Sequence, residues 1–188
     1  MAARRRELLA GVAGRIIEVG AGDGRNFAHY PDRVTEVLAV EPEAYLRRRA
    51  QRNASRARVR IDVVDGVVDD LPAETGSFDA AVVTLVLCSV PEQMTGLAEL
   101  RRVLRPGGRL FFLEHVRADT AAARRVQRLA DRTLWPRLFG GCHTGRDTVT
   151  AISRAGFTIE SLRAFRFPAG RIGPPSSPHV LGVASLPR

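Results

Sequence analysis

The sequence contains no lysine, only two cysteines, and no apolar run long enough to cross a membrane. Cys88 and Cys142 are too few for a disulfide framework, which favours a reducing compartment. No segment approaches the ~20 apolar residues of a membrane-spanning helix, and residues 1–6 lack the apolar stretch of a signal peptide. We therefore expect a cytoplasmic protein without stable membrane insertion.

The absence of lysine also changes the meaning of the positive charge. All 29 basic residues are arginine, and the formal net charge is +9. The arginines are scattered along the chain and lack the interleaved aromatic residues that are typical of single-strand binding. They indicate the codon bias of a GC-rich genome, and net charge alone bears on association rather than on fold. We therefore expect no nucleic-acid partner.

The length and the apolar pattern predict one α/β domain. A chain of 188 residues can bury one core but is too short for two comfortable domains. Apolar strand candidates alternate with helical stretches, which is the pattern of a sheet covered on both faces. We expect helices at 43–53 and 92–104, and strands at 15–19, 37–41, 59–64, 79–85, 109–114, 157–164 and 179–184.

Residues 120–138 are predicted to form one further amphipathic helix. Val126, Leu129, Ala130 and Leu134 fall on one side, and arginines fall on the more exposed side. Such a helix can lie on an anionic membrane. The alternative that we favour is a cap helix with a solvated arginine face.

The most informative motif is a glycine-rich turn after the first strand. The apolar run ends in Gly20, Gly22 and Gly24, so a ligand can lie against bare backbone. Glu41 closes the next apolar run, where an acid would meet a ribose diol. A dinucleotide fingerprint needs a glycine at position 25, where this chain has Arg25. The spacing Glu18-x-Gly-x-Gly-x-Gly instead resembles motif I of class I S-adenosylmethionine-dependent methyltransferases.

Further landmarks support that resemblance. Residues 71–79 (Leu-Pro-x4-Ser-Phe-Asp) and 100–108 (Leu-x2-Val-Leu-Arg-Pro-Gly-Gly) are similar to the ubiquinone/menaquinone methyltransferase-like branch. Residues 26–31, 84–90 and 113–116 resemble the animal proteins that methylate alkyl thiols. The resemblance implies a single domain over 1–188, a Rossmann-like, mostly parallel seven-stranded sheet whose last strand is antiparallel, and a cap insertion at about 116–147. Those relatives carry an N-terminal hydrophobic anchor, which we expect this chain to lack.

The resemblance also implies S-adenosylmethionine as cofactor and assigns residues to it. Backbone groups of residues 20–24 would hold the methionine part, Glu18 its ammonium group, and Glu41 the ribose hydroxyls. The full expected cofactor set is Glu18, Gly20, Ala21, Gly22, Gly24, Asn26, Glu41, Pro42, Val67, Val68, Thr84 and Leu85. Asp65 and Asp69 are both candidates to accept a hydrogen bond from the adenine amino group. The alternatives are that Glu18 and Glu41 are ordinary surface acids and that Leu85 packs in the core.

Methyl transfer from a sulfonium needs alignment more than acid–base chemistry. His115 is the candidate catalytic base, and the equal alternative is a structural histidine at a strand end. Cys88, Cys142, His143 and Arg146 are candidate substrate residues. We expect no metal, because Cys142 and His143 are adjacent, and their soft partners Cys88, His29 and His179 are remote in sequence.

These observations lead to one favoured function and several alternatives. The resemblance to the alkyl-thiol methyltransferases implies methyl transfer to a small-molecule thiol. A thiol pKa near ~8.5 already supplies some thiolate at neutral pH, so this acceptor needs little help from a base. An O-, N- or C-methyltransferase of quinone, lipid or secondary metabolism would share every cofactor landmark. A non-catalytic S-adenosylmethionine-binding module is the alternative from another class. The short segment before the first strand would leave the pocket open or require a homodimer.

Overall fold

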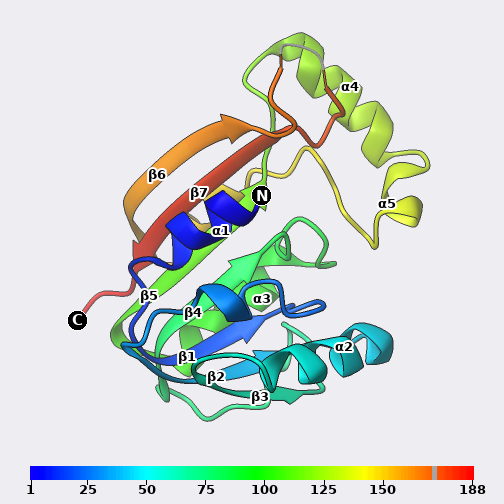
Figure 1. Cartoon of the computed structure of the whole chain (residues 1–188). Coiled ribbons are helices and arrows are strands. Elements are labelled where there is room, and N and C mark those ends of the chain that lie inside the picture. Colours follow the sequence, from blue (N-terminus) through cyan, green and yellow to red (C-terminus); the bar gives the residue numbers. More distant parts are fainter. Residues whose placement is uncertain (171–172) are drawn as a thin grey trace.

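The computed structural model describes residues 1–170 and 173–188, and its core is one seven-stranded sheet (Figure 1). The strand order is β3-β2-β1-β4-β5-β7-β6, in which β7 alone runs antiparallel to both of its neighbours. The elements in chain order are α1 (Ala2–Leu9), β1 (Gly14–Val19), η1 (Phe27–His29), β2 (Val34–Val40), α2 (Ala44–Ala54), β3 (Arg60–Val64), β4 (Phe78–Thr84), α3 (Gln93–Val103), β5 (Leu104–His115), α4 (Ala121–Asp131), α5 (Trp135–Leu138), α6 (Thr148–Arg154), β6 (Thr158–Arg166) and β7 (Pro178–Ser185). The predicted fold class is confirmed.

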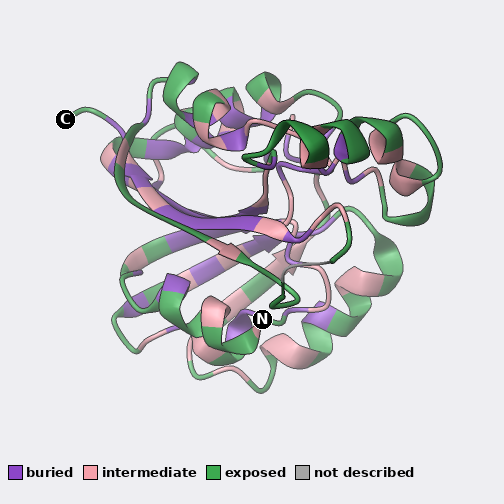
Figure 2. Cartoon of the chain, turned by 90° about the horizontal axis from the view of Figure 1, so that it is seen from above, coloured by how far each residue is buried: buried purple, intermediate pink, exposed green. Residues whose placement is uncertain are grey.

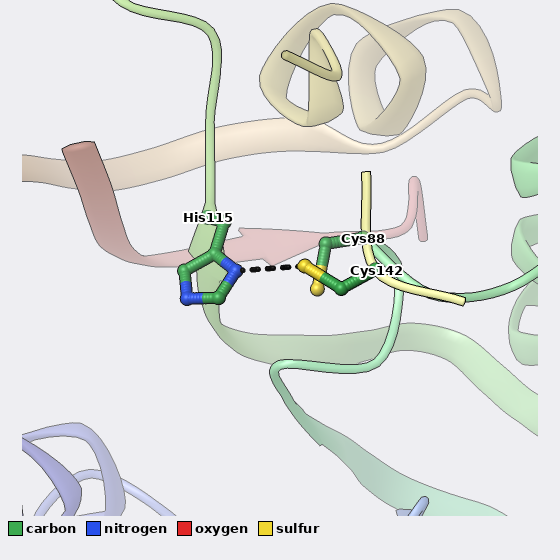
Figure 3. A group of neighbouring side chains, drawn as sticks. All are labelled: Cys88, His115 and Cys142. Atoms are coloured by element: carbon green, nitrogen blue, oxygen red, sulfur yellow. Dashed lines mark hydrogen bonds between the residues drawn. The ribbon is translucent and has the colours of Figure 1, made fainter. Parts of the chain in front are cut away.

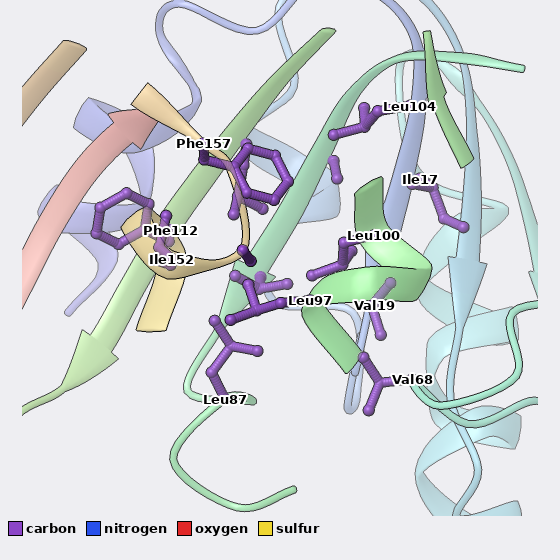
Figure 4. Close-up of a cluster of buried hydrophobic side chains, with 14 of the residues drawn as sticks. Ile17, Val19, Val68, Leu87, Leu97, Leu100, Leu104, Phe112, Ile152 and Phe157 are labelled. Atoms are coloured by element: carbon purple, nitrogen blue, oxygen red, sulfur yellow. The ribbon is translucent and has the colours of Figure 1, made fainter. Parts of the chain in front are cut away.

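The sheet is covered by helices on both faces, as Figure 2 shows from above. On one face, α1, η1 and α2 contribute Leu8, Phe27 and Ala50 to an apolar cluster. On the other face, α3 and α6 contribute Leu97 and Ile152 to a second cluster (Figure 4). Because both faces of the central strands are dry, these strands are continuous apolar runs and do not alternate with polar residues.

The parallel strands bring their carboxyl ends to one edge of the sheet. β1 pairs with β2 and β4 in parallel register, so Val19, Val40 and Val83 lie side by side at that edge. The backbone N–H of Gly20 donates to the Val40 carbonyl at 2.9 Å, which holds the turn after β1 against the end of β2. Ligands of open α/β sheets bind at this edge.

The segment between β5 and α6 differs from the prediction of one helix at 120–138. Helix α4 ends at Asp131, and α5 begins only at Trp135. Pro136 lies in the first turn of α5, where a proline is tolerated, whereas it would break a helix that ran through this position. Figure 1 shows both helices at the far end of β5, as a cap beside the sheet.

Helix α4 also differs from the prediction in the face that it exposes: its apolar side chains lie in solvent. Leu129 is 66% exposed and Val126 is 55% exposed, while Gln127 is buried. The Gln127 amide donates to the carbonyls of Val116 and Thr144, and its oxygen accepts from the Ala118 N–H at 2.8 Å. The buried Gln127 side chain therefore holds α4 against the protein body, and the apolar side of α4 faces solvent. Within residues 1–170 and 173–188, every helix is too short or too polar to cross a bilayer.

Candidate active site

A pocket of about 760 Å³ opens at the carboxyl edge of the sheet. This volume lies within the ~300–1,000 Å³ typical of small-molecule sites. Its walls come from the ends of β1, β2 and β4 and from the loops that follow them. The lining residues are Arg5, Val19, Gly20, Ala21, Gly22, Asp23, Arg25, Glu41, Pro42, Leu46, Arg49, Gly66, Val67, Val68, Asp69, Thr84, Leu85, Val86, Ser89, Val90, Pro91 and Gly140.

The glycine turn forms the floor of the pocket. Gly20 and Gly22 have φ values of +67° and +60°, a region that other residues enter at a cost. A Cβ on Gly22 would meet nothing within 4 Å, so this backbone faces open space. Gly24 does not line the pocket, and a Cβ there would lie 2.6 Å from the Phe27 ring. Gly24 therefore serves packing against η1.

Glu41 lies beside this turn with both carboxylate oxygens anchored. Its Oε2 accepts from the Gly22 N–H at 2.7 Å, and its Oε1 accepts from the Glu43 N–H at 3.0 Å. Glu41 is buried and lines the pocket. Each carboxylate oxygen can accept a second hydrogen bond. The side chain is thus fixed and still able to accept from two hydroxyl groups.

The two candidate acids of the adenine site occupy different environments. Asp65 has an exposed carboxylate that pairs with Arg47 at 2.9 Å, and it does not line the pocket. Asp69 lines the pocket, and its Oδ1 is buried without a hydrogen-bond partner. A buried acceptor without a donor is costly. This oxygen is closed off from solvent and lies 3.5 Å from the position that a Cβ on Gly96 of α3 would take. A role for Asp69 in binding the adenine amino group stays a prediction.

Glu18 and Asn26 lie behind the pocket and do not line it. The Tyr30 hydroxyl donates to Glu18 Oε2 at 2.6 Å, and Asn26 Nδ2 donates to Glu18 Oε1 at 2.9 Å. Burial raises the pKa of Glu18 to about 7, although these two hydrogen bonds favour its charged form. A role for Glu18 in binding the ammonium group stays a prediction.

Arg5 is a pocket residue that the sequence did not indicate. Helix α1 brings Arg5 to the pocket, where its guanidinium donates to Asn26 Oδ1 at 2.8 Å. Arg5 is one of three consecutive arginines near the N-terminus, and nothing local distinguishes it from Arg4 or Arg6. Only the packing of α1 against the sheet selects it.

Strand β4 ends at the pocket in a constrained turn. Thr84 and Leu85 line the pocket, and Leu85 has a φ of +60°. The cost of about 1 kcal/mol or more for this conformation is offset by a hydrogen bond from the Leu85 N–H to the Leu113 carbonyl at 2.8 Å. Thr84 Oγ1 accepts from Asn26 Nδ2 at 3.1 Å, which links β4 to the buried network behind the pocket.

Glu114 holds the loop after this turn and was missed by the sequence analysis. Its carboxylate is fully buried and accepts from the N–H groups of Val86, Leu87 and Cys88 at 2.9, 3.2 and 3.2 Å. Burial raises the pKa of Glu114 to about 7 against the effect of these hydrogen bonds. An acid at the end of an apolar strand, next to His115, was the available signal.

Three of the candidate catalytic and substrate residues come together, and none of the three lines the pocket. His115 Nδ1 lies 3.2 Å from Cys142 Sγ, and Cys88 Sγ completes a group whose ligand atoms all lie within 4.8 Å of one another (Figure 3). Cys88 and Cys142 are remote in sequence, but the loop after β4 meets the cap segment and brings their sulfurs together. Sequence spacing therefore did not reveal this group. His29, His143 and His179 are not part of this group.

His143 and Arg146 are occupied by the backbone. His143 Nδ1 lies 2.8 Å from the Gly141 carbonyl oxygen. Arg146 donates to the carbonyls of Leu87 and Pro91 at 3.2 and 3.4 Å. The two Arg146 contacts tie the cap segment to the loop after β4. A substrate-binding role for either side chain stays a prediction.

Comparisons with known proteins agree with this geometry. A family described as a methyltransferase domain matches residues 17–112. A thiol S-methyltransferase of Homo sapiens is 35% identical over 98% of this chain and 79% of its own length. A ubiquinone/menaquinone biosynthesis C-methyltransferase of Syntrophotalea carbinolica is 32% identical over 72% of this chain and 58% of its own length.

A solved structure shows the same fold. The S-adenosylmethionine-dependent methyltransferase from Mesorhizobium loti aligns with a TM-score of 0.72 at 21% identity, covering 98% of both chains. Together with the open glycine turn and the anchored Glu41, these matches identify the cofactor as S-adenosylmethionine. The chain belongs to the class I S-adenosylmethionine-dependent methyltransferases and is a homologue of the thiol S-methyltransferases and of the ubiquinone/menaquinone C-methyltransferases.

Proposed function

We propose that this enzyme transfers the methyl group of S-adenosylmethionine to the thiol of a small molecule. When bound, the cofactor supplies a methyl group on a positively charged sulfur. In the proposal the turn at Gly20 and Gly22 carries the methionine part, Glu41 accepts the ribose hydroxyls, and Asp69 accepts from the adenine amino group. The name of the human relative supports a thiol acceptor.

The lining of the acceptor end carries the proposal. Among the described residues that line the pocket from Leu85 onward, none is a histidine or a carboxylate; they are Leu85, Val86, Ser89, Val90, Pro91 and Gly140. An acceptor bound here therefore has no side-chain base to take its proton, and it must ionise without one. A thiol with a pKa near ~8.5 is partly ionised at neutral pH, whereas a phenol near ~10 is much less so.

His115 has no proton-transfer step in this proposal. Its Nδ1 is engaged by Cys142, and the residue does not line the pocket. Alignment of the acceptor sulfur with the methyl group and the donor sulfur supplies most of the catalysis. The apolar wall of Val86 and Val90 excludes water and favours an alkyl thiol.

An acceptor panel tests the proposal. The purified protein is incubated with S-adenosylmethionine and an alkyl thiol, a phenol, an amine or a quinol, and formation of S-adenosylhomocysteine is measured. We expect turnover with the thiol, at a rate that rises with pH as the thiolate fraction rises. Methylation of the phenol, amine or quinol without any thiol turnover would overturn the thiol assignment.

A carbon acceptor is the second candidate, and the relative from Syntrophotalea carbinolica favours it. Methylation of a quinol ring carbon requires removal of a proton from that ring, and the acceptor end has no base among its described lining residues. The quinol arm of the panel separates the two candidates, with Glu41→Ala as the control that weakens donor binding equally in every arm.

A further inference from the structure

Three soft ligand groups meet where three separate segments of the chain come together. Cys88 lies in the loop after β4, His115 ends β5, and Cys142 follows α5 in the cap. Figure 3 shows the imidazole and the two thiols directed toward one another. Cys88 and Cys142 are the only cysteines of the chain, so both of its thiols are in this group.

The spacing of the three groups matches a tetrahedral metal site. Zinc–sulfur bonds of ~2.3 Å and zinc–nitrogen bonds of ~2.0 Å place neighbouring ligand atoms about 3.5–3.8 Å apart. The observed separation of His115 Nδ1 and Cys142 Sγ is 3.2 Å, and no pair in the group exceeds 4.8 Å. Shifts of a few tenths of an ångström to about 1 Å would bring all three atoms to bonding positions.

The surroundings favour a thiophilic cation over a hard one. Glu114, the acid next to His115 in sequence, accepts from three backbone N–H groups and is not among the grouped ligand atoms. The three ligand atoms are two sulfurs and one imidazole nitrogen, which is a donor set that soft cations of the zinc class prefer.

We propose that Cys88, His115 and Cys142 together bind one divalent cation of the zinc class, and that this ion fastens the cap segment to the carboxyl edge of the sheet. Each ligand comes from a different segment, so the ion would join the loop after β4, the end of β5 and the cap. Binding displaces the protons of both thiols, and these protons pass to solvent. Water completes the coordination.

The place of the ion adjoins the acceptor end of the pocket. The Ser89 hydroxyl lies 3.5 Å from Cys88 Sγ, and Ser89 itself lines the pocket. Gly140, two residues before Cys142, lines the pocket as well. The ion would therefore fix one wall of the acceptor site through the backbone of residues 88–89 and 140–142. This inference stands independently of the identity of the acceptor.

Metal titration of the full chain tests the proposal without an activity readout. Reduced, chelator-treated protein is titrated with Co²⁺ and with Cd²⁺, and thiolate-to-metal charge-transfer absorption is recorded. We expect one ion per chain. Cys142→Ser and His115→Asn should weaken binding by more than the ~10–100-fold that is typical of losing an outer-shell partner. His29→Asn, which changes a histidine outside the group, should bind as the wild type does.

Two further measurements keep the test decisive if a variant folds poorly. In the wild type, one equivalent of Cd²⁺ should protect both thiols from alkylation. It should also slow tryptic cleavage at the arginines of α4 several-fold, since trypsin cuts after Arg124 and Arg128 once the cap opens. Absence of charge transfer in the wild type, or unchanged alkylation and cleavage with Cd²⁺, would overturn the proposal.

Discussion

Glu41 Oε2 accepts a hydrogen bond from the backbone N–H of Gly22 at 2.7 Å. The carboxylate that ends β2 thus holds the glycine turn that follows β1. A single side chain shapes the floor of the pocket and offers its free lone pairs to the ligand. Removing Glu41 should therefore change both the turn and the contact with the ribose.

We expect Glu41→Ala to weaken binding of S-adenosylhomocysteine by about 10–100-fold, since hydrogen bonds to a charged group contribute about 1.5–3 kcal/mol. Isothermal titration calorimetry measures the change. Glu43→Ala is the matched control, because Glu43 caps α2 through the N–H groups of Tyr45 and Leu46 and does not line the pocket. Its loss should cost about 1 kcal/mol of stability and leave affinity unchanged. Equal affinities of the two variants would refute the assignment.

Asp69 and Asp65 provide a second matched pair. Asp69→Ala should weaken S-adenosylhomocysteine binding by about tenfold, while Asp65→Ala should leave it unchanged. The wild type should also prefer S-adenosylhomocysteine over its inosine analogue, which lacks the amino donor. If Asp69→Ala keeps that preference in a competition assay, the oxygen of Asp69 does not read the adenine.

The raised pKa of Glu18 predicts a pH dependence of stability. The folded-state pKa is about 7, against an ordinary value of 4.5. Between these values the unfolded chain loses the Glu18 proton while the folded chain retains it, so this group stabilises the fold at low pH and its contribution is lost as pH rises toward 7. A shift of this size corresponds to about 3 kcal/mol.

Glu18→Gln tests this dependence, because glutamine stays neutral throughout. Urea unfolding at pH 5 and pH 8 should show the variant gaining stability relative to the wild type as pH rises. Glu114 also has a raised pKa, but it is present in both proteins and cancels from the difference. A constant difference between the two proteins across this pH range would contradict the prediction.

The exposed side of α4 predicts a contrast between two leucines. Leu97 is fully buried between α3 and the sheet, whereas Leu129 is 66% exposed. Leu97→Ala should therefore lower the free energy of unfolding by about 2–5 kcal/mol, and Leu129→Ala should change it by less than about 0.5 kcal/mol. Chemical denaturation of both variants measures this. A large loss for Leu129→Ala would mean that the cap helix packs on this side.

The central strands β1 and β4 were predictable because they are buried on both faces and therefore appear as apolar runs. The exception is the start of β5, which was expected at 109 and lies at Leu104. The sequence Pro106-Gly107-Gly108 indicated a break, but an irregular pairing of Phe78 with Leu104 keeps this segment in the sheet. Tertiary pairing with β4 overrides the local tendency of proline and glycine.

The site was predictable only where its residues have a characteristic spacing in the sequence. The glycine turn and Glu41 have a spacing that can be read directly, whereas Arg5 and Glu114 reach the site through packing. Asp65 and Asp69 are chemically identical, so only burial distinguishes them. Likewise, the helical pattern of 120–138 could not reveal that Gln127 is the residue that faces the protein body.

The position of β7 between β5 and β6 has a consequence for folding during synthesis. In the order of translation β6 precedes β7, yet within the sheet β6 hydrogen-bonds only to β7. The parallel strands β1 to β5 can assemble as soon as they leave the ribosome. Strand β6, in contrast, has no partner until residues 178–185 emerge and insert beside β5, so the nascent chain exposes one unpaired strand edge until then.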